Sequence, residues 1–279
     1  MTLNTDLKTD LKTDNTWTIL SFDIGVKNLA FCMMKWDPEL PSGKKYNILK
    51  WDVVNLIPES ESPTCEGCIK YKGKRAKVLG ITEKICGKIA SFYCKDVTDT
   101  NKAYCKTHIP DATKAIPIKL QKIADVTNQD LNLALVKELD KLPYMLDCDE
   151  VLLEHQPATN PRMKNLSFMI YSYFVIRGFV DHPTSRFNSI QFRQINSLKK
   201  FSIYDGPKVT CDLKQKYDQN KFYSKVYCEY LIREDKPWLE MFQKAKKKDD
   251  LADCFLQGAW FLNKHYSNGK KITRIKKKE

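Results

Sequence analysis

The sequence predicts an α/β protein built on a mixed five-stranded sheet flanked by helices, with a small cysteine-rich insert. Three observations lead to this prediction. Three apolar, β-favouring segments joined by short turns follow one another near the N-terminus. Later segments alternate between helical and strand periodicity. Between these two parts, residues 58–117 show little periodicity and contain six cysteine or histidine side chains that can bind a metal ion.

Composition points to a folded protein with an anionic partner. The chain has 279 residues, which is long enough for one or two domains. It is 42% hydrophobic and carries a formal net charge of +13. The positive charge favours a polyanion, with nucleic acid before a membrane. No window of about 18 apolar residues appears and the N-terminus has no apolar signal core, so we expect an intracellular protein that is not secreted.

The two ends of the sequence are polar. Residues 1–16 contain a small Thr-Asp-Leu-Lys repeat and are predicted to be a disordered tail. Residues 267–279 form a basic C-terminal tail, which would add salt-dependent affinity for phosphate. The main domain is therefore expected to span residues 17–266, interrupted by the insert at 58–117.

Residues 17–24, 29–36 and 46–55 are predicted to form three strands of an antiparallel meander. Asp23 stands at the end of the first strand, within an apolar run. An unpaired buried carboxylate is costly, so this side chain requires a partner or a cation. Gly25 follows and permits the unusual backbone conformation that a turn can need, and it leaves room for a ligand.

The insert has the spacing of a structural zinc site. Cys65-x-x-Cys68 and Cys105-x-x-His108 each supply two ligands from one turn, and Cys86 is a further candidate. Zinc needs four ligands, which leaves two assignments open. One is the symmetrical set Cys65, Cys68, Cys105 and His108. The other, which we prefer, combines one cysteine of the first motif with Cys86, Cys105 and His108, because a knuckle-like glycine follows Cys86.

Helix and strand signals alternate after the insert. An apolar stripe predicts a helix over residues 119–142, and Val151 to Leu153 predict a buried strand that ends in Glu154. The remaining predicted elements are a helix over 161–179, a strand over 189–196, a helix over 222–232 and a helix from about residue 249. Asp250 and Asp253 are three residues apart, so they share one face of that last helix.

Three antiparallel strands followed by helix, strand, helix, strand and helix are the element order of a ribonuclease-H-like domain. In that fold the first and fourth strands are adjacent, which would place Asp23 beside Glu154. A late helix crossing the sheet would add Asp250 and Asp253. Four converging carboxylates do not all stay ionised without cations. We therefore expect two Mg²⁺ ions, with Mn²⁺ as a substitute, to support hydrolysis of a phosphodiester.

Three motifs resemble the RuvC-type Holliday junction resolvases, in particular those of poxviruses and other large DNA viruses. They are the strand and turn around Asp23, the strand ending Leu-Glu154-His-Gln-Pro, and the sequence Lys-Lys-Asp-Asp250-x-x-Asp253. The resemblance implies a homodimeric, Mg²⁺-dependent endonuclease that nicks two opposed strands of a four-way DNA junction. It assigns both catalysis and Mg²⁺ binding to Asp23, Glu154, Asp250 and Asp253, and leaves Asp249 as an extra acid.

The expected DNA contacts and the location follow from the same resemblance. The basic side chains expected to bind DNA are Lys27, Lys199, Lys200, Lys247 and Lys248. A viral chain would act in the cytoplasm of an infected host cell, in recombination, repair or resolution of replicated viral DNA. The cysteine-rich insert departs from the minimal fold, and its role stays open between a junction contact, a dimer contact and a stabilising element.

Other interpretations remain. One is another ribonuclease-H-like nuclease, such as an RNA-guided or transposon-associated enzyme, although those typically carry their zinc module after the glutamate strand. A second is a zinc-containing structure-specific nucleic-acid-binding protein without catalysis. An actin-like ATPase also has an Asp-x-Gly first strand, but it needs a second glycine-rich phosphate hairpin, which is not found among the ten glycines.

Overall fold

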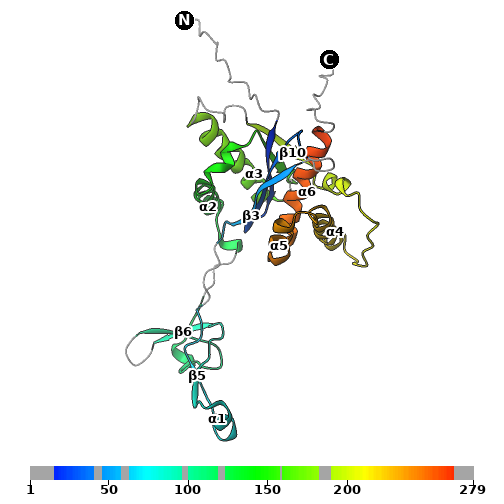
Figure 1. Ribbon diagram of the computed structural model, residues 1–279. Helices are drawn as coiled ribbons and strands as arrows, with labels where there is room; N and C mark the ends of the chain where they lie inside the picture. The colour runs from blue at the N-terminus through cyan, green and yellow to red at the C-terminus, as the bar shows by residue number, and fades with distance from the viewer. Residues whose placement is uncertain are drawn as a thin grey trace, which may run out of the picture. The chain divides into compact units, whose positions relative to one another are not determined.

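The computed structural model describes residues 16–40, 46–57, 63–95, 100–118, 123–157, 159–181 and 190–266. The chain forms two compact units (Figure 1), one made of residues 1–57 and 127–279 and the other of residues 58–126. The predicted tails fall almost entirely outside the described residues. No helix in the described part of the chain is long and apolar enough to span a bilayer.

The first unit is built on a mixed five-stranded sheet with the strand order β10-β9-β1-β2-β3. The two pairs β1–β2 and β2–β3 are antiparallel, whereas β9 is parallel to both β1 and β10. This arrangement confirms the predicted ribonuclease-H-like topology, in which the first strand lies beside the fourth. The strands are β1 (Trp17–Ile24), β2 (Asn28–Trp36), β3 (Asn47–Asn55), β9 (Glu150–Glu154) and β10 (Gln191–Ile195).

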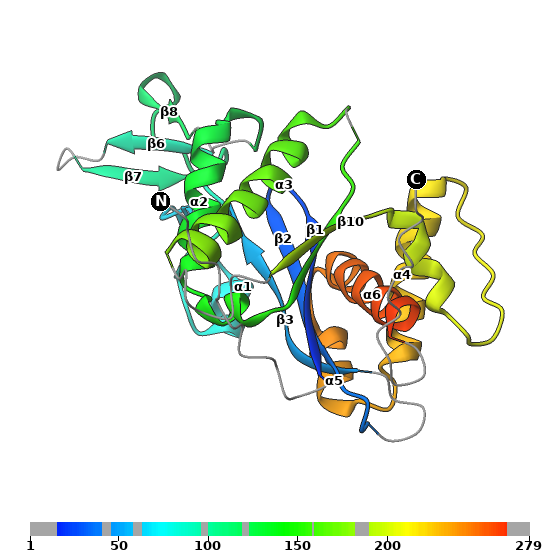
Figure 2. The same cartoon turned by 90° about the horizontal axis from the view of Figure 1, so that it is seen from above.

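Helices cover both faces of this sheet (Figure 2). One face carries α2 (Asn128–Asp140) and α3 (Pro161–Phe174), which continues as a π-helical turn over Val175–Val180. The other face carries α4 (Lys216–Leu231), α5 (Lys236–Lys244) and α6 (Lys248–His265). Short 3₁₀ turns at Pro143–Asp147 and Ser197–Ile203 connect these elements.

Three helices differ from their prediction. α4 begins at Lys216, whereas the sequence predicts a start at residue 222. The helix expected over 119–142 begins only at Asn128, because Thr127 and Asp130 form a capping box that starts it there. The sequence prediction did not include α5, which begins at Lys236 and Pro237. Proline is compatible with the first turn of a helix, where its missing N–H has no intrahelical partner to lose.

A large hydrophobic core lies between the sheet and α6. Its largest fully buried side chains include Phe255 and Phe261 of α6 and Ile19 and Met34 of the sheet. The Trp51 ring on β3 stacks on Phe242 of α5, with ring centroids 5.5 Å apart. This packing fixes α6 across β1 and β2, so its first turn is held rigidly with respect to the ends of the strands.

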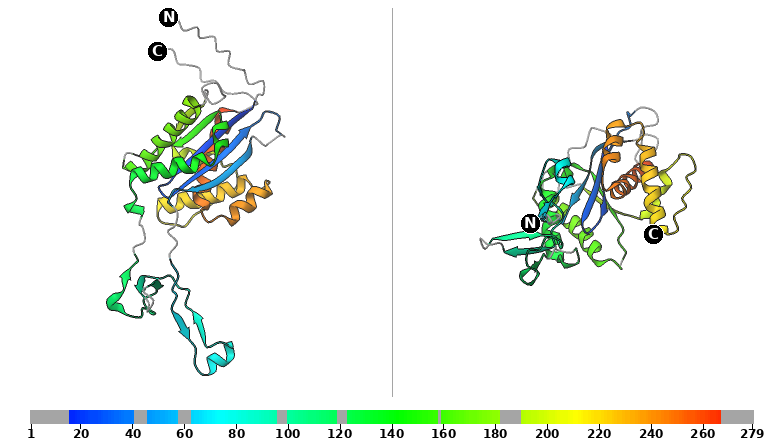
Figure 3. Two further views of the ribbon diagram at one scale, coloured as in Figure 1. Left: turned by 90° about the vertical axis from the view of Figure 1, so that its left-hand side faces the viewer. Right: turned by 90° about the horizontal axis from the view of Figure 1, so that it is seen from below.

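The second unit has little regular structure and a very small core. Its elements are β4 (Cys68–Lys70), α1 (Lys74–Leu79), β5 (Glu83–Ile85), β6 (Phe92–Lys95), β7 (Asn101–Tyr104), a 3₁₀ turn at Ala112–Lys114 and β8 (Ile116–Pro117). β4 pairs with β5 in the cyan hairpin of Figure 3, and β6 lies between β7 and β8 (Figure 2). Its buried cluster consists of Cys65, Cys94, Tyr104 and Cys105, so three of its four members are cysteines.

Candidate active site and metal-binding cluster

Five carboxylates line a single pocket of about 330 Å³ in the first unit. They are the four predicted acids, Asp23, Glu154, Asp250 and Asp253, together with Asp249. We call this site the acidic pocket. Its other lining residues are Ile24, Gly25, Met163, Leu198, Lys200, Phe201, Tyr217, Asn220 and Lys221.

Strand register places Asp23 and Glu154 side by side. β1 and β9 are parallel neighbours, and Phe22 is paired with Leu153. The next residues along the two strands are therefore Asp23 and Glu154, at the same edge of the sheet. Because the two strands run parallel, the carboxylates that end them lie at the same place.

Gly25 is required at the turn because the backbone approaches it closely, and not because of the unusual backbone conformation that the sequence predicts. Its backbone is not in the left-handed region, in contrast to the described glycines with positive φ, which all lie in the second unit. Instead, its N–H donates a hydrogen bond to the carbonyl oxygen of Asn28 at 3.0 Å. A Cβ on Gly25 would lie 2.6 Å from that oxygen, which is too close for any other residue without a shift of the backbone.

Three buried hydrogen bonds from two side chains fix α6 against the sheet. The indole N–H of Trp51 donates to the carbonyl oxygen of Leu251 at 3.1 Å. The Gln257 amide donates to the hydroxyl of Ser21 at 3.0 Å and to the carbonyl oxygen of Phe22 at 3.3 Å. These bonds position the first turn of α6, and with it Asp250 and Asp253, beside the end of β1.

The crowding of negative charge changes the protonation of two pocket carboxyls. Burial, followed by the repulsion from Asp253 and Glu154, raises the pKa of Asp23 well above its usual value. Burial and the neighbouring Asp249 also raise the pKa of Asp250. Both groups would ionise more readily if a cation entered the pocket.

Two lysines provide part of the missing positive charge. Lys200 Nζ lies 2.7 Å from Asp253 Oδ1, and Lys221 Nζ lies 2.7 Å from Asp249 Oδ2. Although burial alone would raise it, the hydrogen bond from Lys221 lowers the pKa of Asp249. The same contact raises the pKa of Lys221 above its usual value. Asp249 and Asp253 therefore each have a lysine partner in the acidic pocket.

The donor set of the acidic pocket fits Mg²⁺. All its acidic ligands are oxygens, which hard divalent cations prefer. In addition, Asp253 Oδ1 is buried and accepts no hydrogen bond, because its ion pair with Lys200 is not aligned as one. The Lys200 ammonium lies 2.7 Å from this oxygen, so the oxygen already occupies a position that favours positive charge.

The structure separates the lysines predicted to bind DNA. Lys200 is buried in the acidic pocket, whereas Lys199 is exposed and its ammonium lies 5.9 Å from the centroid of the Trp260 ring. Lys247 is exposed, and Lys27 and Lys248 are half-buried. Sequence analysis did not identify Lys221 or Gln257 as site residues. Neither lies in a local motif, and only the packing of α4 and α6 brings them to the site.

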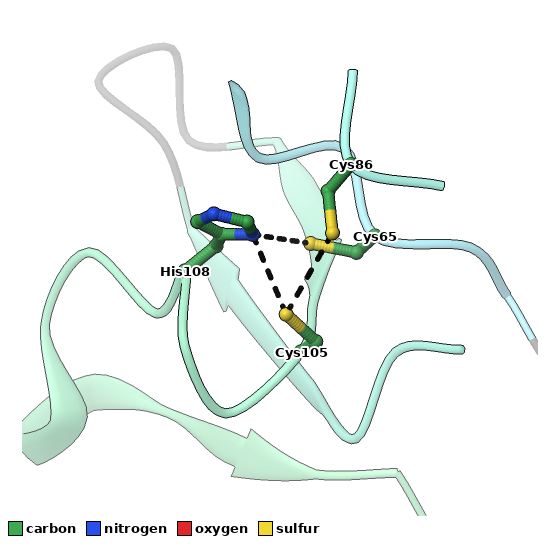
Figure 4. A group of neighbouring side chains, drawn as sticks. All are labelled: Cys65, Cys86, Cys105 and His108. Atoms are coloured by element: carbon green, nitrogen blue, oxygen red, sulfur yellow. Dashed lines mark hydrogen bonds between the residues drawn. The ribbon is translucent and has the colours of Figure 1, made fainter. Parts of the chain in front are cut away.

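The second unit gathers four of the predicted zinc ligands. The ligand atoms of Cys65, Cys86, Cys105 and His108 all lie within 4.8 Å of one another (Figure 4). Cys105 Sγ is 3.4 Å from His108 Nδ1 and 4.0 Å from Cys86 Sγ. Two thiolates that share a tetrahedral zinc at about 2.3 Å are about 3.8 Å apart. We call these four residues the Cys₃His cluster.

Cys68 is not part of the Cys₃His cluster. It is exposed and begins β4, where it is paired with Ile85. Cys86 takes its place, because Gly87 adopts a positive φ of 64° and its N–H donates to the carbonyl oxygen of Cys65 at 3.1 Å. Although burial alone would raise it, hydrogen bonds from the Thr107 amide and from neighbouring thiols lower the pKa of Cys105 to about 6. This favours the thiolate that zinc binds.

Comparisons with known proteins agree with the resemblance. Residues 19–134 match the family model described as "Mitochondrial resolvase Ydc2 / RNA splicing MRS1". Over these residues the match agrees with the predicted resemblance to the resolvases. An uncharacterised protein of Acanthamoeba polyphaga mimivirus, L451, is 28% identical over 88% of this chain and 74% of its own length. The chain thus has a relative in a large DNA virus, as the motifs predict.

Three solved structures resemble the chain at low sequence identity. The fowlpox virus resolvase in complex with Holliday junction DNA is 15% identical, with 88% of this chain and 97% of that chain covered and a TM-score of 0.41. The yeast mitochondrial Holliday junction resolvase Ydc2 is 16% identical, with 90% of this chain and 84% of that chain covered and a TM-score of 0.45. RuvC of Thermus thermophilus is 7% identical, with 88% of this chain and 96% of that chain covered and a TM-score of 0.41.

Proposed function

We propose that this chain, whose residues 19–134 match a resolvase family model, is a Holliday junction resolvase. It is a structure-specific endonuclease that cleaves four-way DNA junctions by paired symmetric nicks. One observation carries the proposal: Asp23, Glu154, Asp250 and Asp253 line the same pocket of a ribonuclease-H-like sheet. They come from two strands and one helix that are far apart in the sequence, and all four line the pocket.

The four acids would hold the divalent cations, for which we propose Mg²⁺ with Mn²⁺ as a substitute. When bound, such cations activate water and stabilise the leaving oxygen of a phosphodiester. Asp23 and Asp250 would lose their protons on becoming ligands, because a cation would offset the burial and the neighbouring acids that raise their pKa values. Lys200 and Lys221 place ammonium groups within the pocket, where they attract the phosphate and limit the repulsion between it and the acids.

Branched DNA is the proposed substrate, and the fowlpox virus enzyme was solved with a Holliday junction. Net charge of +13 supports binding of a polyanion. The exposed cations Lys199 and Lys247 and the half-buried Lys27 and Lys248 are the proposed backbone contacts of the first unit.

We further propose a homodimer, since two opposed nicks require two active sites. Large apolar side chains of α3 and its π-helical extension support this proposal: Phe168, Tyr171 and Ile176 are 58%, 47% and 45% exposed. A second copy of the chain would remove this apolar surface from water. With a mimivirus relative, the place of action that we propose is the cytoplasm of an infected host cell, where replicated viral DNA is resolved.

The Cys₃His cluster is proposed to bind one structural zinc ion. Four protein ligands leave no open coordination position for catalysis. Because the second unit buries so few large apolar side chains, zinc binding would supply much of its folding free energy. We propose that the main domain, residues 17–266, carries this zinc-binding insert at 58–117.

Cleavage of a synthetic four-way junction tests the proposal. We expect paired symmetric nicks by the wild-type chain in Mg²⁺, with little cutting of a duplex or a Y-fork. Asp250→Asn should lower the cleavage rate by about a hundredfold or more, since it removes a proposed metal ligand, while junction binding persists. Asp212→Asn provides a matched control, because Asp212 is exposed and lies outside the acidic pocket.

A second function is supported by the family description, which names an RNA splicing protein beside the resolvase. In that case the chain would be a zinc-containing nucleic-acid-binding protein without catalysis. Binding without cleavage in either Mg²⁺ or Mn²⁺ would favour it over the nuclease. Equal cutting of junction, fork and duplex would keep the nuclease and reject the junction as its specific substrate.

A further inference from the structure

A hairpin in the second unit carries a strong and unpaired positive charge. It consists of β4, α1 and β5, residues 68–85, and we call it the basic arm (Figure 1). Tyr71 N–H donates to the carbonyl oxygen of Thr82 at 2.8 Å, which extends the β4–β5 ladder toward α1. Cys65 and Cys86 of the Cys₃His cluster flank the arm, so both of its ends are fixed at the same point.

The charge of the basic arm is one-sided. Six basic side chains are all exposed, and Glu83 is the single acid among them. Within the described residues none of the six forms an ion pair with an acid, whereas lysines of the first unit such as Lys221 and Lys244 do. The six are Lys70, Lys72, Lys74, Arg75, Lys77 and Lys84.

The side chains of the arm do not serve to build a core. α1 has no buried residue. Val78 is 85% exposed and Ile85 is 64% exposed, although such side chains are commonly buried in a folded protein. Arg75 stacks over the Tyr71 ring at 5.4 Å from its centroid and so keeps its guanidinium at the surface. A surface that combines unpaired cations with exposed aliphatic groups fits a partner that offers phosphates beside apolar sugar and base edges.

We infer that the basic arm binds the phosphate backbone of a duplex arm of the branched DNA substrate. This inference deepens the proposed function and rests on it. The arm is a clamp for DNA outside the acidic pocket: it supplies affinity without sequence preference and contributes no group to the cleavage reaction. Zinc, by fixing both ends of the hairpin, would hold these cations in one orientation.

The test is junction binding by the full chain, measured by fluorescence anisotropy over a series of salt concentrations. Mg²⁺ and Mn²⁺ are left out to prevent cleavage, and no chelator is added, so that the chain keeps its zinc. The triple variant Lys74→Gln/Arg75→Gln/Lys77→Gln is compared with the matched control Lys137→Gln/Lys236→Gln/Lys244→Gln, in which three exposed lysines of α2 and α5 are neutralised. Each lost phosphate contact reduces the slope of log K against log salt by about 0.9. The arm variant should therefore bind about tenfold or more weakly at low salt, with a slope reduced by up to about 2.7.

A second triple variant, Lys70→Gln/Lys72→Gln/Lys84→Gln, repeats the test on the two strands of the arm. The charge-retaining variant Lys74→Arg/Lys77→Arg should bind like the wild type. At saturating enzyme in Mg²⁺, both arm variants should cleave bound junction at the wild-type rate, because they leave the acidic pocket intact.

The possible failures are distinguishable. If both arm variants bind as tightly as the control with unchanged slopes while the wild type still cuts junctions, the inference is wrong and the proposed function stands. If the wild type neither prefers nor cuts branched DNA, the proposed function fails, and this inference fails with it.

Discussion

Gln257 of α6 donates a hydrogen bond from its buried side chain to the carbonyl oxygen of Phe22, one residue before Asp23. The two residues are 235 positions apart in the sequence. Through this bond and its partner bond to Ser21, the helix that carries Asp250 and Asp253 is fixed to the strand that carries Asp23. Gln257 is thus a positioning residue for the proposed metal site.

Replacing Gln257 by leucine should affect both stability and cleavage. Loss of a donor to buried groups costs about 1–3 kcal/mol of the free energy of unfolding, and a loosened α6 should lower the cleavage rate about tenfold or more. Urea unfolding and single-turnover cleavage measure the two effects. Gln243→Leu, at an exposed amide bonded to Glu229, should change neither by a comparable amount. A Gln257→Leu enzyme with wild-type activity would remove the positioning role.

Asp23→Asn should abolish cleavage and yet stabilise the Mg²⁺-free protein at neutral pH. The pKa of Asp23 is raised in the folded state, so the folded protein retains a proton there that the unfolded chain has lost. Stability therefore falls as pH rises from the unfolded pKa of about 3.9 through the raised folded pKa. Asparagine does not ionise, so it removes this dependence of stability on pH. Urea midpoints at pH 5 and pH 8, measured without Mg²⁺ or Mn²⁺ and without a chelator, should show a smaller loss of stability for the variant than for the wild type.

Protons and divalent cations should compete for the acidic pocket. Because burial and neighbouring acids raise the pKa values of Asp23 and Asp250, a cation must displace protons when the pH is below those values. The Mg²⁺ concentration for half-maximal cleavage should then fall with rising pH, by about tenfold per pH unit for each displaced proton. Mg²⁺ titrations of the cleavage rate at several pH values measure this, and an unchanged midpoint would contradict it.

The two adjacent aspartates at the start of α6 should differ in importance. Lys221 already neutralises Asp249, whereas Asp250 is without such a partner among the described contacts and has a raised pKa. Asp249→Asn should therefore reduce cleavage less than about tenfold, against about a hundredfold or more for Asp250→Asn. Asp249→Asn is the matched control for Asp250→Asn, because the two variants carry the same substitution at adjacent positions. Equal losses would place both carboxylates in the metal site.

Two cysteine variants decide between the two zinc assignments. Cys86→Ser should lose bound zinc, because Cys86 belongs to the Cys₃His cluster, and the second unit should become sensitive to proteolysis. Cys68→Ser should retain about one zinc per chain, since Cys68 is exposed and outside the cluster. Elemental analysis of the purified proteins gives the answer. Zinc loss in Cys68→Ser alone would restore the symmetrical assignment.

Local patterns in the sequence are sufficient for much of the fold. β1 has the predicted bounds, and β2, β3 and β10 differ from theirs by one or two residues, because apolar alternation and turn residues act between near neighbours. α5 was missed because its short apolar stripe begins at a proline, which in the sequence marks the end of the preceding helix equally well.

The sequence by itself determined which carboxylates end strands or begin a helix, and so which acids are candidates for the acidic pocket. Only the tertiary structure decided that Lys200 and Lys221 share that pocket, that Gln257 fixes α6 to β1, and that Cys86 rather than Cys68 joins the cluster. The physical reason is that each of these contacts depends on how distant elements pack. Periodicity and motif spacing report the preferences of a segment, whereas the contacts between segments arise from burial of the shared core.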